Sequence, residues 1–136
     1  MYLLDTNIVS DLRRPERAND GVLRWVGSTD VDSMYVSALT LMEIHIGVLR
    51  AERRDAAAGR VLRQWLDERV VPSFAGRVLA IDGPVALLCA RLHVPDARPE
   101  RDALIAATAL VHGFTVVTRN TGDFAATAVP LLNPWT

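Results

Sequence analysis

The chain has 136 residues, of which 50% are hydrophobic, and its formal net charge is -1. This composition excludes a disordered chain and a strongly basic surface, and the length is typical of one domain with a sizeable core. All 15 basic residues are Arg, so any chemistry that requires a Lys is excluded. The single cysteine, Cys89, excludes disulfides within the chain. No signal-peptide pattern or apolar run of membrane-spanning length is recognisable, so we expect a cytoplasmic protein.

Short apolar runs alternate with helical patterns along the whole chain. We expect strands at residues 1–4, 34–38, 77–81, 114–118 and 129–132. We expect helices at residues 7–13, 20–26, 40–50, 53–69, 83–93 and 100–112, and a loop or short helical turn at 119–128. The alternation of strands with helices predicts an α/β fold with a parallel sheet and right-handed crossovers.

Helix-start and helix-stop residues set the expected boundaries. Thr6 is a candidate cap for the first helix and Asp20 for the second. Thr40 and Glu43 form a Thr-x-x-Glu capping box, which predicts that the third helix begins there. Gly113 is the expected C-terminal residue of the helix that precedes the fourth strand. These signals place Glu43 in the first turn of its helix.

Four carboxylates are expected to meet at one edge of this sheet. Asp5 directly follows the first strand and Asp123 follows the fourth, while Glu43 and Asp102 occupy the first turns of two helices. Ligands of open parallel sheets bind beyond the carboxyl ends of the strands, and the crossover helices begin at the same edge. Each acid alone is explained equally well as a cap, a turn residue or a favourable charge at a helix N-terminus.

Taken together, four carboxylates at one edge would repel one another strongly without a counter-ion. No Lys is available to neutralise them, and Arg119 is the only nearby base in the last loop, so a hard divalent cation is the natural partner. Receiver domains and haloacid-dehalogenase-type phosphatases also use acids at this edge, but they rely on a Lys, as does a phosphate-binding P-loop. A metal-dependent nuclease needs no Lys, because the metal ions carry the positive charge.

Several short segments together match a known family. They are Leu4-Asp5-Thr6-Asn7, Thr40-Leu41-Met42-Glu43-Ile44 with Gly47, Asp102-Ala103-Leu104-Ile105-Ala106-Ala107, Thr118-Arg119-Asn120 with Asp123-Phe124, and Asn133-Pro134-Trp135. With these segments the chain resembles the PIN-domain ribonucleases, and specifically the VapC-type toxins of bacterial type II toxin–antitoxin pairs. The resemblance covers essentially the whole chain. It implies one PIN domain at residues 1–136, a three-layer α/β/α sandwich around a mainly parallel sheet of four to five strands.

The resemblance implies a Mg²⁺- or Mn²⁺-dependent endoribonuclease that hydrolyses RNA phosphodiester bonds with a metal-activated water. In that family four acids coordinate the metal and carry the catalysis, and they match Asp5, Glu43, Asp102 and Asp123. Polar residues that support the site match Thr6, Asn7, Thr118 and Asn120.

The resemblance also implies partners. We expect a cognate antitoxin that masks the site, often with an Arg placed among the acids, and a homodimer. Candidate RNA-contacting bases are Arg13, Arg14, Arg50, Arg53 and Arg119, although a solvated helix face explains most of them equally well. Two alternatives stay open: a nuclease-fold partner in a DNA-binding repressor complex, and a housekeeping RNA-processing nuclease.

Overall fold

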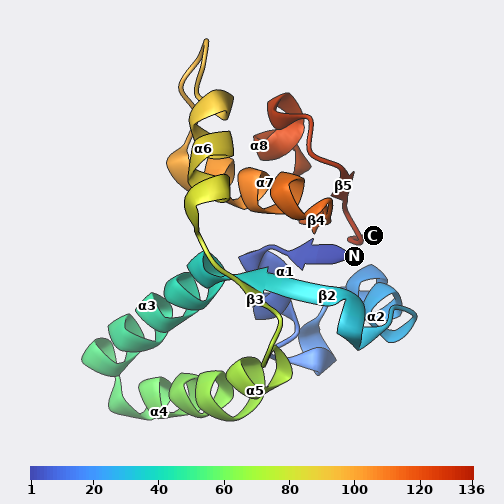
Figure 1. Cartoon of the computed structure of the whole chain (residues 1–136). Coiled ribbons are helices and arrows are strands. Elements are labelled where there is room, and N and C mark those ends of the chain that lie inside the picture. Colours follow the sequence, from blue (N-terminus) through green and yellow to red (C-terminus); the bar gives the residue numbers. More distant parts are fainter.

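The structure, a computed structural model, describes all residues from 1 to 136 and is built around a five-stranded sheet (Figure 1). Every neighbouring pair of strands is parallel, and the strand order is β3-β2-β1-β4-β5. The strands are β1 (Tyr2–Leu4), β2 (Met34–Ser37), β3 (Val78–Leu79), β4 (Thr115–Val117) and β5 (Leu131–Leu132). All five expected strands are therefore present, although each is shorter than its apolar run.

Helices cover both faces of the sheet. In Figure 1, α3, α4 and α5 lie on one side of the sheet, and α6, α7 and α8 lie on the other. The helices are α1 (Thr6–Asp11), α2 (Asp20–Gly27), α3 (Ala38–Arg54), α4 (Ala56–Trp65), α5 (Val71–Ser73), α6 (Gly83–Leu92), α7 (Glu100–His112) and α8 (Thr121–Phe124). This arrangement confirms the predicted three-layer α/β/α architecture. No helix is both long enough and apolar enough to cross a membrane.

The neighbouring strands β1 and β4 each contribute residues to the hydrophobic cores on both faces of the sheet. Leu4 and Val117 pack on one face with residues of α1 and α3, whereas Leu3 and Val116 pack on the other face with residues of α7 and α8. Successive residues of a strand point to opposite faces, so a continuous apolar run is what a strand covered on both sides requires. The last two residues of each strand are buried for this reason.

The chain reverses its direction across the sheet between β1 and β4. From β1 it proceeds through β2 to β3 at one edge, and it then returns to place β4 and β5 on the other side of β1. The amide of Asp5 donates to the carbonyl of Val117 at 2.9 Å, which holds the ends of β1 and β4 together. Such a switch point is where open parallel sheets bind their ligands.

Three predicted helix caps are wrong, by one residue at α1 and α2 and by three at α3, because the caps are the residues that end the preceding strand or loop. Asp5, with an extended backbone, caps α1 in place of Thr6, and Asn19 caps α2. Ser37 caps α3, which begins at Ala38, so the predicted capping box at Thr40 does not form. Glu43 therefore lies in the second turn of α3.

The expected helix at residues 53–69 is divided into several segments. The helix α3 continues to Arg54, and Asp55 then adopts an extended backbone and caps α4 through the amides of Ala57 and Ala58. A π-helical turn, Leu66–Val70, follows α4 and leads into α5. Gly113 ends α7 in the left-handed conformation, with φ of 71°, as predicted.

Candidate active site

Asp5 is the buried centre of the site at the switch point. Its residue is 1% exposed, and both carboxylate oxygens are fixed by hydrogen bonds. The amide of Thr6 donates to Oδ1 at 2.8 Å, and the hydroxyl of Thr118 donates to Oδ2 at 2.8 Å. The side-chain amide of Asn7 lies 3.5 Å from Oδ2 and 3.2 Å from the Thr118 hydroxyl. The polar residues predicted to support the site thus hold Asp5 in one orientation.

Glu43 and Asp102 reach the same place from helices on opposite sides of the sheet. Glu43 projects from α3, with 29% of its side chain exposed. Asp102 lies in the first turn of α7, with 17% of its side chain exposed. Both are partly screened from water, so their charges interact more strongly than charges on the open surface do.

Arg101 joins these three carboxylates. Its Nε donates to Glu43, one terminal nitrogen donates to Asp102 at 2.9 Å, and the other donates to Asp5. The nitrogen that bonds Asp5 also donates to the hydroxyl of Thr6 at 3.2 Å. A guanidinium carries five N–H donors in a planar fork, so its three nitrogens can each face a different acceptor. We name Asp5, Glu43, Asp102 and Arg101 the acid–arginine cluster.

Arg119, the one base expected nearby in the last loop, makes no ion pair with the acids. Arg119 instead lies over the ring of Trp135, with its guanidinium carbon 5.7 Å from the ring centroid. The sequence does not predict that Arg101 joins the acids, because Arg101 resembles an ordinary charged residue on an exposed helix face. A positive residue in the first turn is nevertheless unfavourable to the helix dipole, so its place beside Asp102 was the available signal.

The cluster keeps Arg101 charged. Burial acts to lower the pKa of the guanidinium, but the hydrogen bonds to Glu43 and Asp5 and the negative charges of both groups outweigh it, so the pKa is raised above its ordinary value. Three carboxylates and one guanidinium leave the cluster with a formal charge of about -2 when all are ionised. A positive ion is therefore still attracted to this edge of the sheet.

Asp123 lies outside the cluster. It belongs to the short helix α8, is exposed, and its carboxylate makes no hydrogen bond or ion pair. Asn120 is also exposed, and it supports the site only through its backbone amide, which donates to the Thr118 hydroxyl at 3.0 Å. The structure thus joins three of the four predicted acids through Arg101 and shows no contact between the fourth and this cluster.

The donor chemistry of the cluster fits a hard divalent cation. Carboxylate oxygens are the ligands that Mg²⁺ and Mn²⁺ prefer, and Asp5, Glu43 and Asp102 offer six of them, as two per carboxylate. Their present spacing around Arg101 is that of a guanidinium site, and no three acidic, histidine or cysteine side chains converge on one point at metal-ligand distances. The residue types therefore suit a metal, whereas their present arrangement suits Arg101.

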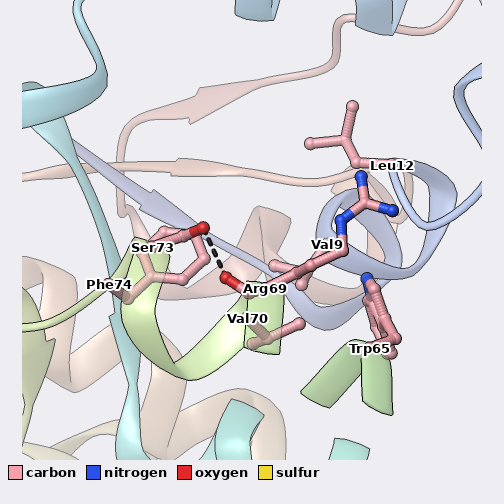
Figure 2. A pocket seen from close by; sticks show the side chains of 7 residues that line it. All are labelled: Val9, Leu12, Trp65, Arg69, Val70, Ser73 and Phe74. Atoms are coloured by element: carbon pink, nitrogen blue, oxygen red, sulfur yellow. Dashed lines mark hydrogen bonds between the residues drawn. The ribbon is translucent and has the colours of Figure 1, made fainter. Parts of the chain in front are cut away.

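A row of hollows leads away from the cluster between α1 and α4. The first, of about 240 Å³, is lined by Thr6, Glu43, Arg13 and Trp65 among others. The second, of about 340 Å³, lies between Arg13, Arg14 and Arg69. Figure 2 shows a third, of about 150 Å³, whose walls are mainly apolar. Trp65 lines all three, so we treat them as one hollow surface, which Glu43 of the cluster also lines.

The predicted RNA-contacting residues other than Arg119 fall into two groups, those that line this surface and those that do not. Arg13 and Arg14 line it, and burial together with the charge of Arg14 lowers the pKa of Arg13. Arg50 and Arg53 are exposed on the C-terminal half of α3 and line none of the three hollows. Trp65 and Arg69, which the sequence alone did not single out, share the surface with the first group.

Comparisons with known proteins relate the site to a family. A PIN domain family model matches residues 2–130. The chain is 39% identical over 141 residues to the toxin FitB of Neisseria gonorrhoeae, covering 99% of each chain. It is 34% identical over 142 residues to the VapC ribonuclease Y4jK of Sinorhizobium fredii, covering 99% of this chain and 98% of that protein. The structure of FitAB bound to IR36 DNA superposes with a TM-score of 0.88 at 37% identity, covering 100% of this chain and 96% of that one. The chain therefore belongs to the PIN-domain family.

Proposed function

We propose that this protein is a Mg²⁺- or Mn²⁺-dependent endoribonuclease and the toxin of a toxin–antitoxin pair. The observation that carries the proposal is that Asp5, Glu43 and Asp102, from three parts of the chain, all contact Arg101 at the switch point of the sheet, where Glu43 also lines a hollow. Relatives that align along nearly the whole chain and are named as a toxin and a ribonuclease support it.

The residues of the site have distinct roles in this proposal. Asp5, Glu43 and Asp102 would hold the metal, and Asp123 would approach from the rim. When bound, the metal would supply an activated water and stabilise the leaving oxygen of a phosphodiester. Thr118 and Asn7 keep the Asp5 carboxylate in one orientation, so that this buried ligand needs no rearrangement.

The hollow surface is the proposed path of the RNA strand. Arg13 and Arg14 would contact phosphates along it, while Trp65 offers an aromatic wall to a base. A net charge of -1 makes general attraction to RNA weak, so these local charges matter more than the overall charge. Arg50, Arg53 and Arg119 line none of the hollows, so the proposal does not place them on this path.

The proposed partners are a cognate antitoxin, which would cover the site, and a second copy of this chain. The second candidate function is a nuclease-fold partner in a DNA-binding repressor complex. It is favoured by one observation, the likeness to FitAB bound to a DNA fragment. An antitoxin that binds DNA unites both functions, because the same complex would mask the nuclease and occupy a promoter.

The test is cleavage of RNA by the purified chain in Mg²⁺ or Mn²⁺, with EDTA as the metal-free arm. We expect Asp5→Asn and Asp102→Asn to abolish cleavage, while Asp96→Asn, at an exposed loop position, retains it. Circular dichroism of each variant checks the fold. Wild-type levels of cleavage by Asp102→Asn, or equal cleavage by the wild type with metal and in EDTA, would contradict the proposal. Growth arrest by the wild-type chain alone distinguishes a toxin from a passive repressor partner or a housekeeping nuclease.

A further inference from the structure

Arg101 occupies the place among the acids that a divalent cation would need. Its three nitrogens each bond a different carboxylate, from Asp5, Glu43 and Asp102. These contacts span 96 residues to Asp5 and 58 residues to Glu43, so they connect three separate parts of the fold. A single side chain therefore balances part of the charge of the whole candidate metal site.

The same oxygens cannot serve the guanidinium and a metal in the same way. Oδ1 of Asp5, Oε1 of Glu43 and Oδ1 of Asp102 each accept a bond from Arg101. A bound divalent ion would coordinate these oxygens, and its double positive charge would repel the guanidinium of Arg101. The two cations are therefore alternatives at this site.

The position of Arg101 also favours an exchange over a permanent contact. Its side chain is 36% exposed, so it can rotate into water without crossing the core. It lies in the first turn of α7, where the helix dipole opposes a positive charge. The carboxylates, and not the helix, hold the Arg101 side chain in place. Once a metal ion binds the carboxylates, Arg101 loses the contacts that stabilise its position.

We infer that Arg101 is a built-in competitor of the divalent cation, so that loading the site is an exchange in which Arg101 leaves the acids. The inference rests on the proposed metal site. In the metal-free protein Arg101 stabilises the three carboxylates and keeps the site folded. The metal concentration needed for loading is consequently higher than the acids alone would require, because only the fraction of molecules with Arg101 displaced can bind the ion.

The exchange is tested by measuring Mn²⁺ binding without RNA, by calorimetry and by the loss of free Mn²⁺ signal in electron paramagnetic resonance. The variants are Arg101→Gln, Arg101→Lys and the matched control Arg60→Gln, which removes an exposed charge on α4. We expect Arg101→Gln to lower the Kd for Mn²⁺ by about tenfold or more. Arg101→Lys should give an intermediate Kd, because an ammonium group lacks the fork. Arg60→Gln should match the wild type.

Thermal unfolding supplies a second readout. In EDTA, Arg101→Gln should melt below the wild type, and saturating Mn²⁺ should raise its Tm by more than it raises the Tm of the wild type. An unchanged or higher Kd in Arg101→Gln, with the variant folded, overturns the exchange and leaves the metal site intact. If Arg101→Gln does not fold, an unchanged Kd in Arg101→Lys overturns it. Absence of Mn²⁺ binding in both the wild type and Arg101→Gln instead overturns the proposed metal dependence.

Discussion

The hydroxyl of Thr118 donates a hydrogen bond of 2.8 Å to Oδ2 of Asp5, between residues 113 positions apart in the sequence. Thr118 is completely buried and directly follows β4, while Asp5 directly follows β1. The bond thus crosses the switch point of the sheet. It also gives a buried carboxylate a partner that is independent of Arg101, so Asp5 keeps its orientation if Arg101 departs.

We expect Thr118→Val to damage the site while preserving the shape of the core. The substitution removes the hydroxyl from a buried carboxylate, which should destabilise the fold by about 1–3 kcal/mol. Loss of an orienting hydrogen bond typically lowers metal affinity or activity by about 10–100-fold. Urea unfolding and RNA cleavage at saturating metal measure the two effects. Thr118→Ser keeps the hydroxyl and should retain most activity, and equal losses in both variants would contradict an orienting role of the hydroxyl.

Asp123 should contribute less to metal binding than Asp102 does. Its carboxylate is exposed and makes no ion pair, whereas Asp102 is part of the acid–arginine cluster. Exposed charges are screened by salt, so both substitutions should raise the Kd for Mn²⁺ but to different extents. The Kd of Asp123→Asn should be lower than the Kd of Asp102→Asn by about tenfold or more. Calorimetric titration of both variants gives the comparison. Equal losses would mean that α8 moves toward the ion when it binds.

The sequence predicted the fold well because the strands are buried on both faces. Leu3 and Leu4, like Val116 and Val117, need apolar neighbours on opposite sides, and this requirement is visible as a continuous apolar run. Helix ends were less well predicted. Ser37 is as good a cap as Thr40, and only the position where β2 ends decides between them.

The sequence predicted that Asp5, Glu43 and Asp102 lie together, but it did not predict that Asp123 lies apart from them or that Arg101 joins them. Their meeting was predictable because the carboxyl ends of parallel strands and the N-terminal parts of the crossover helices lie at the same edge of the sheet. The role of Arg101 depends on where a long, flexible side chain rotates, and local sequence does not determine that. Trp65 and Arg69 were missed for a related reason, since the hollow surface exists only once α4 packs near α1.

Arg13 should contribute to RNA binding and Arg53 should not. Arg13 lines the hollow surface next to the acids, while Arg53 is exposed near the end of α3. In the cleavage-deficient Asp102→Asn background, Arg13→Gln should weaken RNA binding and reduce the slope of log Kd against log salt concentration by about 1. Arg53→Gln should leave both quantities unchanged. Fluorescence anisotropy with labelled RNA measures them, and equal effects would place the RNA path elsewhere.

The same substitution should have opposite effects on two glycines of neighbouring helices. Gly59 is buried where α4 crosses α3, and an added Cβ would lie 2.5 Å from the Cα of Glu52. Gly59→Ala should therefore destabilise the fold by about 1–3 kcal/mol, despite the better helix propensity of Ala. Gly47 lies within α3 with no atom inside 4 Å of an added Cβ, so Gly47→Ala should stabilise by up to about 1 kcal/mol. Urea unfolding of both variants measures the difference. Stabilisation by Gly59→Ala would show that α3 and α4 can separate at this crossing at little cost.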